Sequence, residues 1–545
     1  MKSEIQNPKS KITIEILLIL LLVFTPIAFG SQVIWAFSLM ELGILLIIIL
    51  WAIKLLLSQI LKPQSSILSD PQASNLAPQS SIRLPILLLS LFLAIVLLQM
   101  IPLPAGIVKI ISPKTYELRN QLSVTAPVTD VQSEFENPKS EIQSPPQSEI
   151  RNPKSEMLLS SNPNPVKSTI GPHPQSSNLK PQSSFTLTLF PFTTKIRFFQ
   201  WLALAGLFIF LLHWKLSDNR YRITNHLIIA VFLVGVFESL YGMFEFFSGR
   251  RHIFYVDWSD WIHSVTGTFL NRNCFAGYLL MVIPLSIGFF LSREKYRYGR
   301  FMGWRHRLSS LDGKTLLLGF GLILMILALI LSASRGGIIS LLLSFSLMIF
   351  LFRNPSGRER FSKISVLIFG LAVIWAAWIG LDAVISRFFT APEAFMRTRW
   401  ILWAGAYGIL KNFPVLGSGL GTFPEVYSMY RSSHILGLDI QAENDFLQLA
   451  AEVGVVGIVP LLALFVFLFF KATSGIRSLS PEEPQRYIGI GGLVGILALM
   501  FHSIVQKNLQ LPANAFLYTV IWAMVLRIST DSSGKGTPRE QARGE

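Results

Sequence analysis

The motif SASRGG at residues 332–337 places an arginine at the end of an apolar run. Arg335 comes shortly after the stretch LLLGFGLILMILALIL. A guanidinium this close to hydrocarbon is costly unless it is paired or faces water. It could be an anchor that reaches the membrane surface, but Ser332, Ser334 and two glycines surround it with small, donor-rich groups. These surroundings suit an anion, and we predict that Arg335 binds one.

A second set of charged residues lies in the segment from about Arg387 to Glu452, the longest polar gap in the second half of the chain. Arg399 and Trp403 are four residues apart and would share one face of a helix. Arg397 and Ile401 have the same spacing. The segment therefore offers two arginines with aromatic neighbours on a predicted helix.

The glycine-rich turn VLGSGLGTF (415–423) follows that helix. It has no preceding strand and no Walker lysine, so a nucleotide-binding P-loop is not indicated. Tyr427, Tyr430 and Arg431 come next and would suit a saccharide surface. Packing of aromatic side chains at a membrane interface explains the two tyrosines as well.

Two further motifs frame these segments, SVTGTFLNRNCFAG (264–277) and HSIVQKNLQLPAN (502–514). In the first, Asn271 and Asn273 can cap the helix that follows. In the second, His502 lies in or near an apolar segment, where helix packing is the more frequent role of a histidine. Pro512 can open the last helix. Neither motif alone indicates catalysis.

The composition places these motifs in a membrane protein. The chain has 545 residues, 51% hydrophobic and 14% charged, whereas a soluble domain carries about 25% charged residues. Apolar runs of roughly 18 or more residues recur, long enough to cross a hydrocarbon core of about 30 Å. We predict an all-α polytopic membrane protein with about twelve transmembrane helices. The predicted spans are 13–30, 33–54, 84–103, 198–214, 226–247, 274–291, 315–332, 337–352, 364–386, 446–470, 487–505 and 512–527.

Lysine and arginine residues orient these spans. With a cytoplasmic N-terminus, 27 of the 47 basic residues fall on the cytoplasmic side. Ten of the other 20 lie in the long segment 104–197, which the positive-inside rule disregards. The remaining comparison, 27 against 10, predicts cytoplasmic N- and C-termini and a helical external loop (387–445) between spans nine and ten. The net charge of +16 thus reports topology and not nucleic-acid binding.

Repeated polar segments suggest the domain boundaries. SEIQNPKS near the N-terminus recurs within 136–157, and PQSS-rich repeats occupy 63–81 and 174–184. Their apolar residues are too few to offset the entropy of ordering, so we predict disorder. The predicted divisions are N-terminal spans 1–3 (1–103), a low-complexity, disordered external loop (104–197), a membrane domain (198–527) and a disordered cytoplasmic tail (528–545).

Two smaller observations concern disulfides, metal sites and a signal peptide. The single Cys274 excludes an internal disulfide and any multi-cysteine metal site. The first hydrophobic run leads directly into further spans, so we interpret it as the first membrane anchor and not as a cleaved signal peptide.

Four patterns together resemble the O-antigen ligase/polymerase superfamily. The first is SASRGG at the end of a span, and the second is Arg399-x-x-x-Trp403 followed by FPVLGSGLGTF. The third is AENDFLQLAAEVGVVG (442–457), and the fourth is the pair GTFLNRNCFAG and HSIVQKNLQLPAN. Their order, spacing and shared external face carry the resemblance, which covers about 198–527.

The resemblance implies a GT-C-like, metal-independent glycosyltransferase of surface polysaccharide biosynthesis that needs no cofactor. The donor would be a glycan on undecaprenyl diphosphate. The acceptor would be lipid A-core for a ligase or a growing polysaccharide chain for a polymerase. Such a protein spans the bacterial inner (plasma) membrane among its lipids, has its active site on the periplasmic side and has no nucleic-acid partner.

The resemblance also implies roles for individual residues. Arg335 and Arg399, with Arg397 as a substitute, would bind the donor diphosphate, because a guanidinium stays charged and binds phosphate oxygens bidentately. Glu443 stands where many relatives have a histidine, which makes it a candidate general base. Gln506 stands where many relatives have an acid, which is a second departure from the family pattern.

The assignment of the base has alternatives. Asp445 or His434 could serve in place of Glu443, and capping of a helix that begins near Asp445 explains Glu443 and Asn444 equally well. The residues predicted to contact the acceptor or glycan are Trp403, Tyr427, Tyr430, Arg431, His434, Asn444 and Asp445.

Two other classes of protein remain open from sequence. A polysaccharide transporter or flippase fits the number of spans, although few charges lie inside them and the two halves show no clear repeat. A catalytically degenerate family member with a structural role fits the departures at positions 443 and 506.

Overall fold

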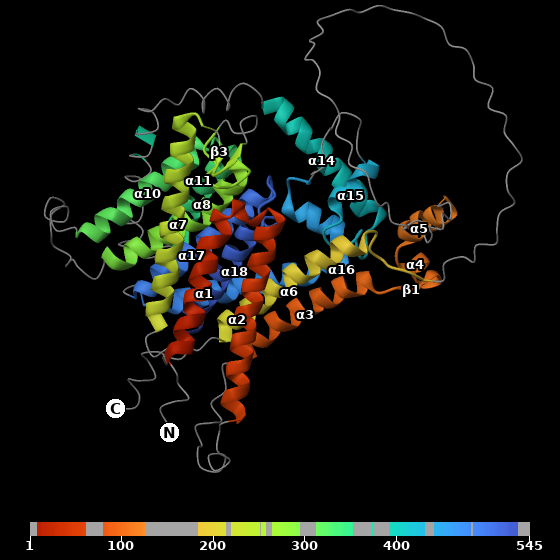
Figure 1. Cartoon of the computed structure of the whole chain (residues 1–545), viewed down its shortest axis with the longest axis horizontal. Helices are drawn as coiled ribbons and strands as arrows, with labels where there is room; N and C mark the ends of the chain where they lie inside the picture. Colours follow the sequence, from red (N-terminus) through yellow and green to blue (C-terminus); the bar gives the residue numbers. More distant parts are fainter. Residues whose placement is uncertain are drawn as a thin grey trace, which may run out of the picture.

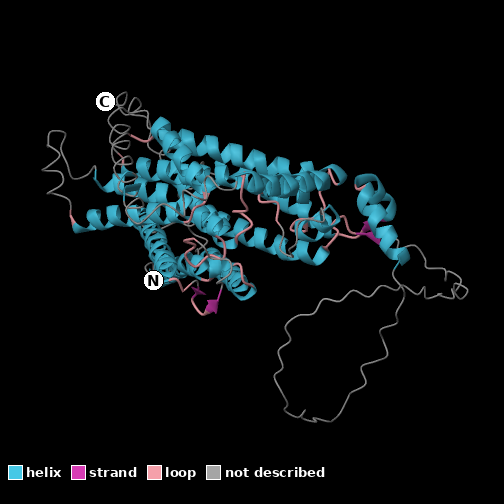
Figure 2. Cartoon of the chain, turned by 90° about the horizontal axis from the view of Figure 1, so that it is seen from above, coloured by secondary structure: helices cyan, strands magenta, loops and turns pink. Residues whose placement is uncertain are grey.

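The computed structural model describes residues 8–60, 80–125, 184–213, 220–250, 252–257, 264–294, 312–351, 370, 373–374, 392–430, 441–480 and 483–531. Helices account for nearly all of this part of the chain (Figure 2). Within it, nine helices are long and apolar enough to cross a membrane, and two shorter apolar helices accompany them. The predicted all-α, multi-pass class is therefore confirmed.

The apolar helices follow the chain as a series of hairpins. They are α1 (Pro8–Ile27), α2 (Ile34–Ile60), α3 (Ser80–Met100), α6 (Pro191–His213), α7 (Arg220–Ser248), α8 (Arg272–Glu294), α10 (Gly313–Leu331), α11 (Arg335–Leu351), α16 (Asp445–Ser478), α17 (Pro484–Ser503) and α18 (Pro512–Asp531).

Shorter elements connect them. They are the helices α4 (Ala105–Ile111), α5 (Pro113–Thr125), α14 (Pro392–Asn412) and α15 (Phe423–Tyr427), the 3-10 turns η1 (Phe29–Ser31) and η4 (Ser428–Tyr430), and the antiparallel pairs β1 (Leu103–Pro104) with β2 (Ser184–Phe185) and β3 (His252–Ile253) with β4 (Val256–Asp257).

Eleven of the twelve predicted spans coincide with apolar helices of the structure. The ninth predicted span, 364–386, lies outside the described residues apart from positions 370, 373 and 374. The last predicted span, 512–527, is the shortest apolar stretch near the C-terminus and forms α18. Apolar run length was thus a sufficient signal for these helices.

The two ends of segment 104–197 differ from the predicted disordered loop. α4 and α5 form directly after β1, and β2 pairs with β1 through Leu103 and Phe185. The side chains of Val108, Phe185 and Leu187 are buried together, and apolar residues of this kind are scarce in the repeats. Residues 126–183, which carry the repeats of this loop, lie outside the described part of the chain.

One arginine joins these two ends. The Arg119 Nη2 group on α5 donates to Thr188 O and Leu189 O, both at 2.9 Å, and to Thr186 Oγ1 at 3.1 Å. Burial lowers the pKa of Arg119. The three hydrogen bonds hold the segment before α6 against α5, which accounts for order at both ends.

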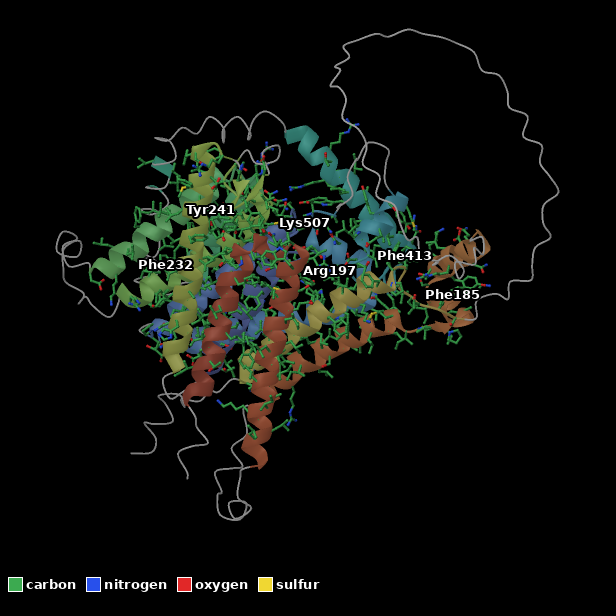
Figure 3. All side chains as sticks on the ribbon, viewed as in Figure 1. Phe185, Arg197, Phe232, Tyr241, Phe413 and Lys507 are labelled. Carbon is green, nitrogen blue, oxygen red and sulfur yellow. The ribbon has the colours of Figure 1, made fainter. Side chains whose placement is uncertain are left out.

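Helices α3, α6 and α16 pack side by side and lead from the main bundle toward α14 and α15 (Figure 1). The helices α7, α8, α10, α11 and α17 gather in the other half of the molecule, and α18 packs against α6, α8, α16 and α17. Figure 3 labels Lys507, from the loop between α17 and α18, and Arg197 of α6 near the middle of the view. The junction of the two groups is therefore the part of the molecule where polar side chains from both can meet.

Glycines allow α8 and α17 to pack with their backbones in close contact. The apolar part of α8 is fully buried. A Cβ on Gly491 of α17 would lie 2.5 Å from Pro284 O of α8, and one on Gly495 would lie 2.8 Å from Met281 O. Real Cβ atoms do not approach backbone oxygens so closely, so these positions accept only glycine in the observed packing.

We expect Gly491→Ala to destabilise the protein by about 1–3 kcal/mol, because the added methyl group overpacks a backbone contact that cannot yield. Gly106→Ala is the matched control, since a Cβ at that position would meet nothing within 4 Å. Thermal unfolding of the detergent-solubilised protein measures the difference. Equal melting temperatures for the two variants would show that α8 and α17 can separate at no cost.

Candidate functional site

The four sequence motifs meet at one end of the helix bundle, around the loop between α17 and α18 (residues 504–511, hereafter the α17–α18 loop). Asn514 Nδ2 donates to Cys274 O of α8 at 3.1 Å. A Cβ on Gly336 of α11 would lie 2.9 Å from His502 Cδ2. The first residue of α16, Asp445, binds the same loop. The motifs at 264–277, 332–337, 387–452 and 502–514 are thereby brought together, with the N-terminal ends of α8, α11, α16 and α18 beside them.

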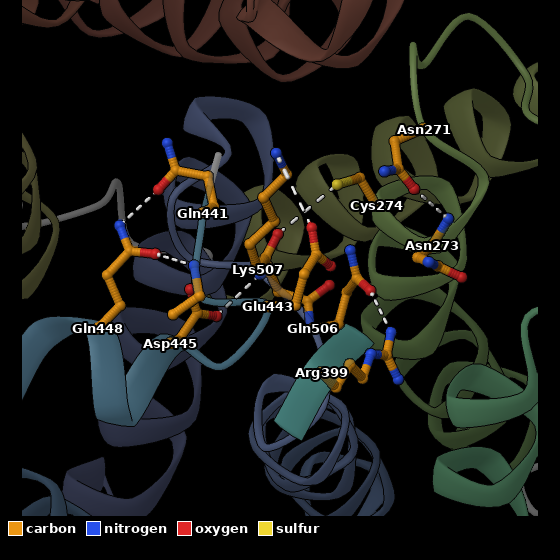
Figure 4. Close-up of polar contacts among 12 residues, drawn as sticks. Asn271, Asn273, Cys274, Arg399, Gln441, Glu443, Asp445, Gln448, Gln506 and Lys507 are labelled. Carbon is orange, nitrogen blue, oxygen red and sulfur yellow. Dashed lines mark hydrogen bonds and ion pairs between the residues drawn. The ribbon is translucent and has the colours of Figure 1, made fainter. Parts of the chain in front are cut away.

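Asp445 fixes the α17–α18 loop. Its side chain is buried, and Oδ2 accepts hydrogen bonds from Asn508 N and Leu509 N, each at 2.8 Å (Figure 4). Carboxylates are stabilised at a helix N-terminus, and Asp445 opens α16. The structure thus gives Asp445 a positioning role, with one oxygen engaged by two backbone amides.

Arg399 reaches the same loop from α14. The side chain is buried, with 8% exposed, and its Nη2 donates to Gln506 Oε1 at 3.2 Å (Figure 4). Burial lowers the pKa of Arg399, the charge of Glu443 raises it, and the charge of Arg335 lowers it. The guanidinium nevertheless stays protonated. Glu443 and Arg335, which the sequence singled out separately, therefore both lie within electrostatic reach of Arg399.

Glu443 and Asn444 form the start of α16. Asn444 is the N-cap, and its Oδ1 accepts from Leu447 N at 3.0 Å, as the capping explanation predicted. Glu443 has φ of +51°, a left-handed conformation that costs a non-glycine residue of order 1–3 kcal/mol. Its Oε1 lies 4.0 Å from Lys507 Nζ. The Glu443 carboxylate therefore lies beside the ammonium group of Lys507.

Arg335 is the first residue of α11, and its side chain is partly buried. The two serines beside it, which the sequence suggested as donors to an anion, also make hydrogen bonds within the backbone turn. Ser332 Oγ donates to Leu329 O at 2.6 Å, and Ser334 Oγ accepts from Gly337 N at 3.3 Å as a helix cap. Arg335 itself remains in place near Arg399.

Two other predicted residues, Arg397 and Trp403, lie on α14. Arg397 is exposed on a different face of α14 from the buried Arg399. Trp403 is partly buried and contacts Trp400 edge to face, with ring centroids 5.2 Å apart. Arg431 and His434 lie outside the described residues. Of the two arginines on α14, only Arg399 is buried and contacts the α17–α18 loop.

The two predicted tyrosines pack α14 against α15 and η4. Tyr427 is fully buried and stacks on Phe423 at 5.3 Å, close to Gly405, where a Cβ would collide with the ring. The Tyr430 hydroxyl accepts from Asn412 Nδ2 at 2.6 Å. These contacts correspond to the packing explanation of the tyrosines, and a fully buried ring such as that of Tyr427 offers no surface to a glycan.

The glycine-rich turn docks into a break of α16. Gly454 interrupts the helix with φ of +65°. The amides of Val455 and Val456 donate to Pro414 O at 2.9 Å and Val415 O at 3.1 Å, in place of carbonyls of their own helix. A Cβ on Gly417 or Gly454 would collide with the opposite backbone. The glycines therefore permit close approach of two backbones, and the turn serves structure and not phosphate binding.

Glu452 and Gln99 hold this turn, and sequence analysis assigned neither of them a role. Glu452 Oε2 accepts from Gly421 N at 2.8 Å, and Oε1 accepts from Gln448 Nε2 at 3.0 Å. Gln99 at the end of α3 donates to Leu416 O at 2.5 Å and accepts from Leu420 N at 3.1 Å. Both side chains are buried. A glutamate two residues before Gly454, in an otherwise apolar run, is the sequence signal that could have indicated the contact.

The network continues to the residue before Glu443. Gln448 Oε1 accepts from Ala442 N at 3.1 Å, and its Nε2 donates to Gln441 Oε1 at 2.5 Å (Figure 4). Gln441, Ala442 and Gln448 are buried. The turn, α16 and the backbone that carries Glu443 therefore form one hydrogen-bonded unit.

Metal ligands are not gathered in the described residues, which contain no group of three or more His, Cys, Asp or Glu side chains that could hold an ion. The charged groups at the site are instead Arg335, Arg399, Lys507, Glu443 and Asp445. Such an arrangement can bind an anion through its cations, and its carboxylates can accept a proton.

Fold and site thus define a multi-pass helical membrane protein with a cation-rich polar site at one end of its bundle. Residues 320–462 match the family model described as O-antigen ligase, so this part of the chain is similar to the O-antigen ligase family, as its motifs predicted. The match supports an O-antigen ligase- or polymerase-type function in polysaccharide biosynthesis. It spans Arg335, Arg399 and Glu443, and is shorter than the predicted region 198–527. A search of curated proteins finds no match.

Proposed function

We propose that this protein transfers a glycan from an undecaprenyl-diphosphate donor to a hydroxyl group of lipid A-core or of a growing polysaccharide chain. The observation that carries the proposal is the convergence of Arg335, Arg399 and Glu443 at one end of the bundle, inside the stretch that matches the O-antigen ligase family. Departure of a diphosphate develops negative charge, and guanidinium groups held beside that position stabilise it.

The N-terminal ends of four helices add positive charge to that of the arginines. α8, α11, α16 and α18 all begin at the site, and each N-terminus carries roughly half a positive charge. Backbone amides at helix N-termini are common phosphate ligands. The site is therefore positive through both side chains and backbone, which suits a diphosphate better than a neutral sugar.

The proposed transfer needs one proton acceptor. The acceptor hydroxyl oxygen attacks the anomeric carbon of the donor glycan, the bond from that carbon to the diphosphate oxygen breaks, and the diphosphate leaves with the electron pair. Glu443 accepts the hydroxyl proton as general base. The arginines supply the charge that a metal ion would otherwise provide, so the proposed reaction is metal-independent.

The test of this proposal is transfer itself. The purified chain in lipid nanodiscs is supplied with a lipid-linked glycan and, in separate reactions, with lipid A-core or with a second lipid-linked glycan. Glycan on lipid A-core would identify a ligase, and a lengthened lipid-linked chain would identify a polymerase. Flux of the donor across liposomes without any new glycosidic bond would instead support a flippase.

The site is proposed to face the periplasm, and labelling tests that side. In a Cys274→Ala background, we expect a cysteine at exposed Lys411 of α14 to react with a membrane-impermeant maleimide added to spheroplasts, which expose the external face of the inner membrane. A cysteine at exposed Ser478, the end of α16, should react only after lysis. The reverse pattern would invert the topology and place the site in the cytoplasm.

A further inference from the structure

Lys507 projects from a rigid part of the α17–α18 loop. The residues on either side of it, Gln506 and Asn508, are fully buried. Its own carbonyl accepts from Cys274 Sγ at 3.6 Å, and the next two amides are held by Asp445. The backbone of Lys507 is therefore fixed from three sides, so a change of partner by this lysine requires only its side chain to move.

The contact between Lys507 and Glu443 is close enough for charge attraction but too long for a hydrogen bond. Nζ and Oε1 are 4.0 Å apart, and the two side chains are 15% and 22% exposed (Figure 4). A charge-assisted hydrogen bond to a phosphate oxygen is shorter, about 2.7–2.9 Å, and stronger. A phosphate that enters the site can therefore replace Glu443 as the partner of Lys507.

The backbone on both sides of Glu443 holds its carboxylate beside Lys507. The amide of Ala442 donates to Gln448 Oε1, and Asn444 caps α16, so the backbone on both sides of Glu443 is fixed. The charge of Glu443 also acts on Arg399. The Glu443 carboxylate thus lies beside Lys507 and within electrostatic reach of Arg399.

We propose that Lys507 is a third cation of the donor site and that Glu443 is its counter-ion until the donor binds. This inference rests on the proposed glycan transfer. The diphosphate of the donor binds Lys507 together with Arg335 and Arg399, and Glu443 loses its cationic partner. The acceptor hydroxyl then loses its proton to Glu443 as its oxygen bonds to the anomeric carbon and the diphosphate leaves with the electron pair.

This exchange explains how Glu443 can be a counter-ion before the donor binds and a base afterwards. A carboxylate beside an ammonium group takes up a proton less readily than one without that neighbour. Loss of Lys507 to the diphosphate therefore makes Glu443 a stronger base only when a donor is present. The same exchange means that Glu443 opposes diphosphate binding, since the two anions compete for the same cation.

The test measures binding of inorganic pyrophosphate to the full chain in nanodiscs by calorimetry. We expect Lys507→Met to raise the Kd by about 10-fold, equivalent to about 1.4 kcal/mol, and Lys507→Arg to restore most of the affinity. Glu443→Gln should lower the Kd several-fold, because the competing charge is gone. Lys411→Met, which removes an exposed lysine of α14, is the matched control and should bind as the unmodified protein does.

The two variants are expected to change the Kd for pyrophosphate in opposite directions, which distinguishes a functional role of the ion pair from a structural one. Both Lys507→Met and Glu443→Gln break the same ion pair, so a merely structural pair would move the Kd in one direction for both. Unchanged binding by Lys507→Met, or weaker binding by Glu443→Gln, would overturn the inference while leaving the proposed transfer intact. If the unmodified protein does not bind pyrophosphate, or if Arg399→Ala binds it equally well, the diphosphate site itself fails.

Discussion

Replacement of Arg399 by alanine is expected to lower kcat for glycan transfer by about 10²–10³-fold, the usual effect of removing one donor from a site of developing negative charge. Arg399 is the buried guanidinium of α14 and lies within electrostatic reach of Arg335 and Glu443. Arg399→Lys should recover part of the rate, because an ammonium group keeps the charge but not the bidentate geometry. Transfer from a lipid-linked donor in nanodiscs measures both variants.

A loss of folding could imitate this result, since Arg399→Ala leaves Gln506 Oε1 buried without its donor. An unpaired buried acceptor costs about 1–3 kcal/mol, whereas replacing both partners by apolar groups can be nearly neutral. The double variant Arg399→Ala with Gln506→Leu should therefore regain stability and stay inactive. Wild-type transfer by a stable double variant would remove Arg399 from the mechanism. Lys411→Ala on the same helix serves as the control and should keep full activity.

The arrangement of the motifs could be anticipated because it depends on helix direction. SASRGG and AENDFLQLAAEVGVVG each precede or open an apolar run that starts on the same predicted side as the run after HSIVQKNLQLPAN. Run length identified α8, α11, α16 and α18, and the basic residues gave their common direction. The meeting of these four helix starts in the structure follows from that direction and from close packing of the bundle.

The contacts at the site could not be anticipated, because they join residues distant in sequence. Lys507 was not singled out within the motif HSIVQKNLQLPAN, and only the fold brings it close to Glu443. Gln99 reaches Leu416 and Leu420 across more than half the chain. No periodicity or local motif encodes such pairs, since they are set by how whole helices pack.

Residue type alone also led to a wrong expectation for the exposure of Tyr427. Tyr427 follows a glycine-rich turn and reads as a surface aromatic, but the ring fills the space left by Gly405 on α14. Gly405 belongs to the stretch AGAYG, and such small residues on a facing helix are the signal that an aromatic ring packs against it. The serines of SASRGG have a local role that residue type did not indicate, because both hydroxyl groups make hydrogen bonds within a backbone turn.

The break at Gly454 divides α16 into two parts with different surroundings. The sequence EVGVVG reads as a continuous apolar helix, yet Gly454 divides it into a short N-terminal part, which carries Asp445, and a long apolar part. The docked turn fixes the angle between the two parts through the amides of Val455 and Val456. A discontinuous helix of this kind is tolerated at membrane depth only where other protein groups satisfy its backbone. The position of Glu443 and Asp445 therefore depends on the turn as much as on α16.

Replacement of Glu452 by alanine should consequently damage both stability and transfer. The change leaves Gly421 N and Gln448 Nε2 without their buried acceptor, at about 1–3 kcal/mol for each donor. Glu452→Gln keeps one acceptor oxygen and should lose about half as much. Glu425→Gln is the control, because its amide oxygen can still accept from Thr193 Oγ1, which now lies 3.1 Å from Glu425 Oε1.

Thermal unfolding of the three variants in detergent gives the order of stability, and transfer measured well below the melting temperature gives the effect on the site. Because Glu452 reaches Ala442 through Gln448, folded Glu452→Gln should lose kcat with little change in the KM for the donor, since the arginines and Lys507 stand on other elements. A folded Glu452→Gln variant with normal kcat would show that Glu443 keeps its position without the network. A raised KM alone would instead connect the turn to donor binding.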